Sequence, residues 1–141
     1  MVLKHSKQVR LEITITEHTC ESIYVDITSG NALKMDINVN SRLTKSSFYK
    51  NCFNQMMQYQ ESILWCYCDG DFANISDKYV LRGLEELDEA AETIVDNYVK
   101  YMYEEILFLL EGIKVQEICL KGFFEGHEQV IINRLGNRLD G

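Results

Sequence analysis

Three segments near the start of the chain alternate strictly between apolar and polar residues. They cover residues 9–15, 23–27 and 33–39, and short turns separate them. A period of two is typical of strands that bury one face, and short connections favour antiparallel neighbours. The pattern therefore predicts a three-stranded meander with one apolar face. Its outer face would then be polar, with Arg10, Glu12, Thr14, Tyr24, Asp26, Lys34 and Asp36.

Helical periods follow the meander. Thr44 and the serines after it can cap a helix that begins near residue 45 and ends near residues 64–66. A second helix can start at Ser76 or Asp77, and Gly83 inside it would weaken or kink it, because glycine costs about 1 kcal/mol relative to alanine in a helix. We therefore expect two helical segments between the meander and residue 84.

Residues 84–111 have the strongest helical pattern in the chain, and the other elements are expected to pack around them. Their apolar positions recur at steps of three and four: Leu84, Leu87, Ala91, Ile94, Tyr98, Met102 and Leu109. One continuous helix would be about 40 Å long, at about 1.5 Å per residue. Residues 106–110 are apolar on every side, so the core or a second subunit must cover them.

The end of the chain has a weaker pattern. Residues 113–120 and 129–135 are expected to form two strands, although the second segment also fits a short helix. The chain contains no proline and no linker-like stretch, so we expect a single domain over residues 1–141. The predicted fold class is α+β: an antiparallel three-stranded N-terminal meander, two long helices on one sheet face, and a C-terminal hairpin that can extend the sheet.

The negative charge is concentrated in one segment. The chain has 14 basic and 22 acidic residues, a net charge of −8, and residues 85–111 contain one lysine and nine carboxylates. At about 100° per residue, five of these carboxylates lie on one strip of the predicted helix: Glu85, Asp88, Glu89, Glu92 and Asp96. Tyr103 lies in line with this strip, whereas Tyr98 and Tyr101 are expected in the core. An exposed aromatic residue beside carboxylates is typical of a binding interface.

Composition also limits the compartment and the class of partner. The first residues contain no apolar signal region, and no stretch approaches the about 20 apolar residues of a membrane span. Five cysteines, an odd number, fit reduced thiols in the cytoplasm. Direct nucleic-acid binding requires clustered basic residues, which this sequence lacks. A basic protein or protein complex is therefore the expected partner, with no membrane involved.

Three patterns could support other chemistry. The helix carboxylates could bind Mg²⁺, as helix carboxylates do in all-helical nucleotide pyrophosphatases; they are Glu85, Glu86, Glu89, Glu92 and Asp96. The helix after residue 45, however, offers only Glu61 opposite them. Cys66 and Cys68 do not have the usual zinc spacing, and His5, His18 and His127 are scattered. His127 with Arg134 and Arg138 could bind a small anion. We assign no catalytic residue, metal site or cofactor.

The leading functional hypothesis is a small, soluble, non-enzymatic interaction or inhibitor protein. Its acidic helix face would bind a basic partner and could occlude a groove that normally holds nucleic acid. Small inhibitors from phages and mobile elements are often acidic and free of motifs in this way. One alternative is a homo-oligomer with a small-molecule pocket between subunits, based on the apolar residues 106–110. The other is a Mg²⁺-dependent hydrolase that uses the helix carboxylates.

Overall fold

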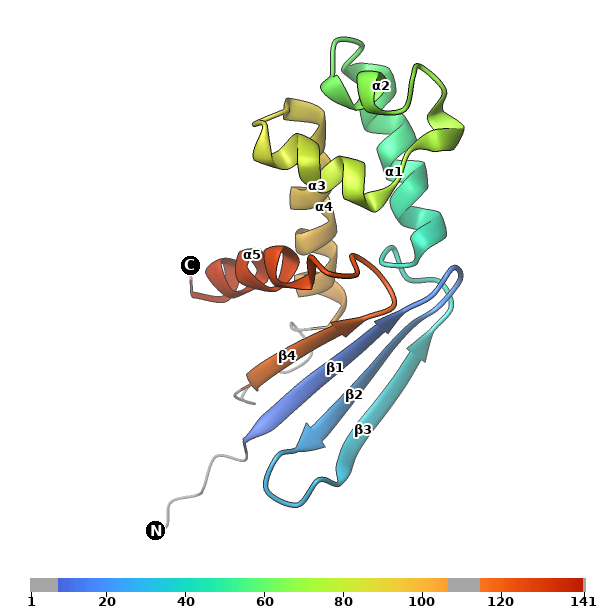
Figure 1. The fold of residues 1–141 in the computed structure, drawn as a ribbon. Coiled ribbons are helices and arrows are strands. Elements are labelled where there is room, and N and C mark those ends of the chain that lie inside the picture. The colour runs from blue at the N-terminus through green and yellow to red at the C-terminus, as the bar shows by residue number, and fades with distance from the viewer. Residues whose placement is uncertain (1–7, 107–114, 141) are drawn as a thin grey trace.

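The computed structural model describes residues 8–106 and 115–140, which form one four-stranded sheet and five α-helices (Figure 1). The strands are β1 (Val9–Ile15), β2 (Cys20–Asp26), β3 (Ala32–Asn38) and β4 (Val115–Lys121). The helices are α1 (Lys45–Gln58), α2 (Ile63–Tyr67), α3 (Asp77–Glu85), α4 (Glu89–Glu105) and α5 (Glu128–Asp140), and a short 3₁₀ turn, η1 (Phe72–Asn74), precedes α3. The predicted α+β class is confirmed.

The sheet has the strand order β3-β2-β1-β4. β1, β2 and β3 are antiparallel neighbours, so the predicted meander is confirmed. β4 is parallel to β1, and helices α1 to α4 provide the long crossover that a parallel pair requires. The predicted C-terminal hairpin was wrong, because the residues after β4 form α5, which confirms the alternative of a helix over residues 129–135. Ile131 and Leu135 are fully buried, and their spacing of four is helical.

The two faces of the sheet differ from the prediction, and the first turn is the reason. The turn at residues 16–19 sets a register in which Leu11 lies opposite Tyr24 and Glu12 lies opposite Ile23. Directly opposite residues point to the same face of a sheet. Tyr24 therefore shares the buried face with Leu11, and Ile23 points to the outer face. The length of the turn, not the hydrophobic pattern of β2, decides which residues are inside.

The same register continues into β3. Lys34 is opposite Tyr24, and Met35 is opposite Ile23, so the apolar residues of β3 also lie on the outer face. The exposed fraction of these side chains is between 44% and 66% for Leu33, Met35, Ile37 and the following Val39. The prediction of a polar outer face was right for Arg10, Glu12 and Thr14. It was wrong for Tyr24, Asp26, Lys34 and Asp36.

The long helix predicted over residues 84–111 is in fact interrupted. α3 ends at Glu85, Leu87 has a positive φ of 62°, and α4 begins after Asp88. The Asp88 side chain accepts a hydrogen bond from the Ala91 N–H, which is how an N-cap starts a new helix. Residues 107–111 of the predicted helix lie outside the described part of the chain. The helix predicted from residue 45 is also divided, into α1 and α2.

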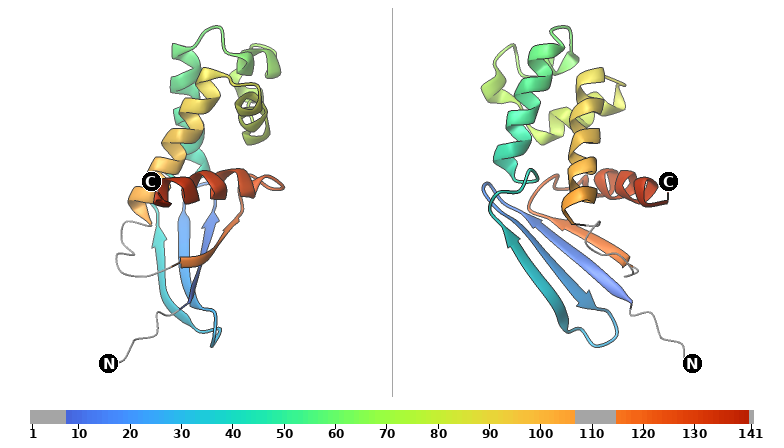
Figure 2. Two further views of the ribbon diagram at one scale, coloured as in Figure 1. Left: turned by 90° about the vertical axis from the view of Figure 1, so that its left-hand side faces the viewer. Right: turned by 180° about the vertical axis from the view of Figure 1, so that it is seen from behind.

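The helices form two groups around one core. Figures 1 and 2 show α1, α2, α3 and the first part of α4 beyond one end of the sheet, with α5 closer to the strands. One continuous set of buried side chains joins both groups, including Leu11, Ile13, Phe48, Ile94, Tyr98, Phe124 and Ile131. Tyr98 is therefore in the core, as expected. Each helix in residues 8–106 and 115–140 is too short or too polar to reach across a lipid bilayer.

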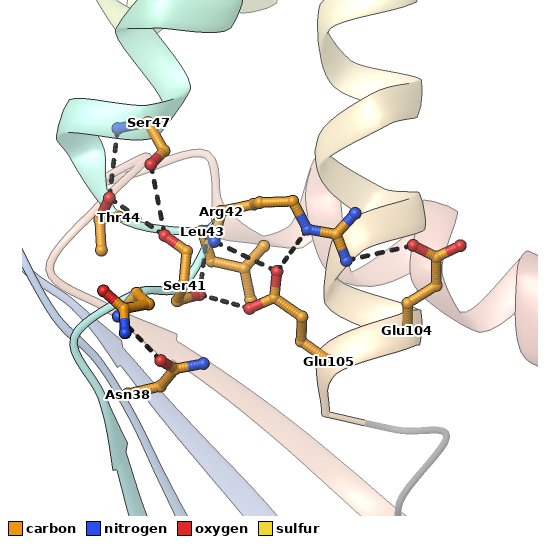
Figure 3. A network of polar contacts seen from close by, with 9 residues as sticks. Asn38, Ser41, Arg42, Leu43, Thr44, Ser47, Glu104 and Glu105 are labelled. Atoms are coloured by element: carbon orange, nitrogen blue, oxygen red, sulfur yellow. Dashed lines mark hydrogen bonds and ion pairs between the residues drawn. The ribbon is translucent and has the colours of Figure 1, made fainter.

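A polar network fixes the end of α4 to the connection between β3 and α1 (Figure 3). The Ser41 hydroxyl donates to Glu105 at 2.6 Å, and the Arg42 backbone N–H and Nε both donate to the other oxygen of that carboxylate, at 3.1 and 2.8 Å. Arg42 also reaches Glu104 at 3.2 Å and stacks on the ring of Tyr101, 4.1 Å from its centroid. Both acidic residues at the end of α4 are thus paired within the fold.

Candidate functional site

The turn between α3 and α4 is the most exposed part of the predicted acidic strip. We call residues 85–89 the acidic corner. Glu85, Glu86 and Glu89 are exposed and make no side-chain hydrogen bond or ion pair with any described residue. Leu87 has 77% of its surface exposed and is in the left-handed backbone region. A leucine rarely adopts this conformation. Because Leu87 is exposed, the acidic corner presents one apolar side chain among three exposed carboxylates.

Asp88 lies in the same turn but has a structural role. One carboxylate oxygen accepts from the Ser62 hydroxyl at 2.7 Å and from the Ala91 N–H at 3.0 Å. The other accepts from the Ile63 N–H at 3.1 Å. Asp88 therefore caps α4 and also connects it to the first residues of α2. Its carboxylate is less available to a partner than those of its neighbours.

We expect Asp88→Ala to lower the free energy of unfolding by about 2–3 kcal/mol. The change removes an N-cap, typically worth about 1 kcal/mol, and leaves the buried Ser62 hydroxyl and the Ile63 N–H without their acceptor. Urea unfolding followed by circular dichroism measures the effect. Glu89→Ala, at the next and exposed position, is the control and should change stability by less than about 0.5 kcal/mol. Equal losses for the two variants would contradict this role for Asp88.

An open hollow of about 670 Å³ lies beside the acidic corner. It is lined by residues 58–63, from the end of α1 to the start of α2, and by residues 86–90. Glu61 thus joins Glu86 and Glu89 around one concave surface. The described lining includes no lysine or arginine, so the potential in the hollow is negative and suits a cationic group.

The remaining residues of the predicted strip lie farther along α4. Glu92 is half-buried in the first turn. Asp96 forms an ion pair with Arg134 of α5 at 3.0 Å. Tyr103 is half-buried, and the guanidinium of Arg138 lies 5.8 Å from the centroid of its ring. Exposed ion pairs of this kind contribute little stability. α5 therefore pairs with this end of the strip, although the Asp96 side chain stays 66% exposed.

The fold brings the members of the other candidate sites together only in part. Within residues 8–106 and 115–140, no group of three or more His, Cys, Asp or Glu side chains is arranged to hold a metal ion. Cys66 is exposed while Cys68 is buried, so this pair does not face one site. Arg134 and Arg138, which we considered for anion binding, do line one open hollow beside Asp96, but His127 is not part of it. Arg134 pairs with Asp96, and the Arg138 guanidinium lies 5.8 Å from the Tyr103 ring centroid.

Burial also makes two of the thiols poor nucleophiles. Desolvation raises the pKa of Cys20 to about 11, and the same cause raises the pKa of Cys52, which is fully buried in α1. Both side chains therefore remain protonated at neutral pH and pack as small apolar groups.

Sequence reasoning missed two features of the acidic corner. Glu61 and Glu86 were named only as possible Mg²⁺ ligands. They lie in segments 25 residues apart, and the packing of α2 against α3, with the hydrogen bonds from Ser62 and Ile63 to Asp88, brings them to one hollow. Leu87 fits the helical spacing between Leu84 and Ala91, and no local signal marks its left-handed conformation. Asp88 was a signal only for the start of a new helix, because aspartate is a favoured N-cap.

Comparisons with known proteins identify a related fold but no family. No protein-family model matches the chain, and no curated protein matches it. Among solved structures, it is similar to the native crystal structure of Ta0583, an archaeal actin homolog, with a TM-score of 0.57 and 10% sequence identity. The match covers 96% of this chain and 42% of that one, so this chain spans less than half of that protein's length. At this identity the likeness concerns the fold alone.

Proposed function

We propose that this protein is a small, non-enzymatic interaction protein that binds a basic protein partner through its acidic corner. One observation carries the proposal: Leu87 is held exposed, in an unfavourable backbone conformation, between carboxylates that form no ion pair with any described residue. An apolar anchor surrounded by charges is a common arrangement in protein interfaces.

The backbone conformation of Leu87 supports this proposal because it has an energetic cost. A left-handed non-glycine residue costs about 1–3 kcal/mol and persists only where the surrounding structure holds it. Here the Asp88 cap and two backbone hydrogen bonds hold the turn: Leu87 N–H to Leu84 at 3.1 Å, and Asp88 N–H to Gly83 at 2.9 Å. The acidic corner is thus formed before binding, so a partner would lose little entropy in ordering it.

Charge determines the class of partner. The hollow beside the corner is acidic, and an arginine or lysine side chain of a partner could enter it from solvent. Opposite charges accelerate encounter and select the partner, whereas the contact with Leu87 would slow dissociation. A partner that normally binds nucleic acid has a suitable basic surface. In that case the acidic corner would compete with phosphate groups, and the protein would act as an inhibitor.

The test is a double charge removal, Glu86→Gln with Glu89→Gln. The matched control removes two exposed carboxylates elsewhere, Glu17→Gln with Glu125→Gln, so both variants have the same net charge. Each protein is immobilised and exposed to a lysate of the source cell at low and high salt, and each retained protein is then purified and titrated. We expect the site variant to bind the partner about tenfold more weakly, a loss of about 1.4 kcal/mol, and the control to bind as the unmodified protein does.

Leu87→Ala tests the apolar part of the same surface. It removes the anchor without changing charge, so the affinity should fall while its dependence on salt stays the same. Equal binding by the unmodified protein and all three variants would refute the proposal. So would binding that does not weaken at high salt.

We also propose that the protein works in a reducing compartment such as the cytoplasm. All five cysteines are free thiols, and three of them are buried. Free buried thiols are typical of proteins that are not exposed to oxidising conditions.

A further inference from the structure

β3 is an edge strand whose outer side has no neighbour among the described strands. It pairs with β2 on one side only, and all seven of its residues are exposed. Proteins usually protect such an edge by a covering element, a bulge or inward-pointing charges. Here the register shifts at Leu33, which has no partner on β2, and Lys34 and Asp36 point to the inner face. The strand is regular from Lys34 onward and has four exposed apolar side chains, including that of Val39 just after it. Among the described residues no strand covers this edge, so a further strand whose charges match can pair with it.

The sequence of β3 is complementary to itself. Around Met35, the order of residues is Leu33, Lys34, Met35, Asp36, Ile37. If a second copy pairs in the antiparallel direction with Met35 opposite Met35, then Lys34 lies opposite Asp36 in both directions and Leu33 lies opposite Ile37. Opposite charges and apolar pairs are the contacts that stabilise directly opposite positions in a sheet.

Within one chain, Lys34 and Asp36 already lie on the same face. Their charged atoms are 3.6 Å apart, and both side chains are about half exposed. Pairing with a second copy would place two lysines and two aspartates at alternating corners of one cluster. On the outer face, Ile23 lies opposite Met35, so the two copies would join their apolar rows into one strip.

Other registers are less favourable. A two-fold axis at Asp36 places aspartate opposite aspartate, and an axis at Lys34 places lysine opposite lysine. An axis between two residues puts the apolar face of one strand against the charged face of the other. Parallel pairing in register also stacks like charges. The register centred on Met35 is therefore selected by charge as well as by hydrophobic contact.

We propose that two copies of this chain associate through β3, in the antiparallel register centred on Met35, to form a continuous eight-stranded sheet. The interface is isologous, because the same strand is used by both copies, so it closes as a dimer rather than growing into a filament. Its area is small, and we expect a dissociation constant in the micromolar range. This inference does not depend on the acidic corner, because the turn between α3 and α4 lies away from β3 (Figure 1).

A charge exchange tests the register. Lys34→Asp gives a strand with two acidic residues, and Asp36→Lys gives a strand with two basic residues. In sedimentation velocity over a range of concentrations, each single variant should dimerise at least tenfold more weakly than the unmodified protein. An equimolar mixture should recover a heterodimer, and the double variant with both changes should recover the homodimer. Circular dichroism verifies that every variant is folded.

A cysteine at position 35 gives an independent readout. In a background with Cys66→Ser and Cys119→Ser, Met35→Cys should form a disulfide-linked dimer with oxidised glutathione, since opposite residues in a sheet are within reach of a disulfide. Val39→Cys is the control, because the two copies of residue 39 would be about 26 Å apart, at about 3.3 Å per residue. The inference is overturned if the unmodified protein is monomeric up to about 100 µM. Dimerisation of both single charge variants with unchanged affinity would also overturn it.

Discussion

Phe48→Ala is expected to lower the free energy of unfolding by about 3–5 kcal/mol. Phe48 is only 1% exposed and lies at the centre of an aromatic cluster from three parts of the chain. Its ring makes edge-to-face contacts with four others, with centroid distances of 4.9–5.4 Å: Tyr49, Tyr98, Phe123 and Phe124. The loss combines the transfer energy of the ring, the cavity left behind and the aromatic contacts, which add about 0.5–1.5 kcal/mol per pair.

Phe53→Ala is the matched control for this prediction. It removes the same ring from the same helix at a position that is 44% exposed. Phe53 has one aromatic neighbour, Phe72, with a centroid distance of 5.1 Å. We expect a loss of about 1 kcal/mol or less, because much of the ring remains in water in the folded state. Urea unfolding of the two variants should therefore give clearly separated midpoints, and similar midpoints would contradict the central role of Phe48.

The aromatic cluster also connects the helical group to the sheet. Phe48 belongs to α1, Tyr98 to α4, and Phe123 and Phe124 to the connection between β4 and α5. The acidic corner lies at the distant end of α4, so its position relative to β3 depends on this cluster. Weakening it should destabilise both proposed binding surfaces together, whereas the charge variants leave the core intact.

Much of the fold could be predicted because its signals are local. Alternation identified β1, β2 and β3, and Thr44 and Ser76 do cap α1 and α3, as expected for hydroxyl side chains before a helix. The faces of β2 and β3 could not be predicted in the same way. Their orientation depends on the four residues of the first turn, and a shift of one residue exchanges the two faces of a strand.

The candidate site was predictable only in part. The sequence correctly indicated that Glu85 and Glu89 would be exposed on the surface. It could not indicate that Asp96 pairs with Arg134, which is 38 residues away, or that Asp88 binds the start of α2. These contacts depend on tertiary packing. Which residues of this chain bind a partner remains a prediction, and the charge variants test it.

Gly122→Ala is expected to destabilise the fold by about 3 kcal/mol or more. Gly122 has a φ of +86°, and a Cβ atom there would overlap the carbonyl oxygen of Ile15 at the end of β1. A backbone atom cannot move aside as a flexible side chain can. The substitution therefore combines backbone strain, about 1–3 kcal/mol, with displacement of the connection that carries Phe123 and Phe124 into the core.

Gly126→Ala separates these two effects. Gly126 lies in the same connection with a similar φ of +83°, but a Cβ atom there would meet nothing within 4 Å. It should therefore show the backbone strain alone, at about 1 kcal/mol. If thermal unfolding shows the same loss of stability for both variants, the contact with Ile15 does not add to the cost of Gly122→Ala. A larger loss of stability for Gly122→Ala would show that the end of β1 leaves no room for a side chain at the point where the chain leaves β4.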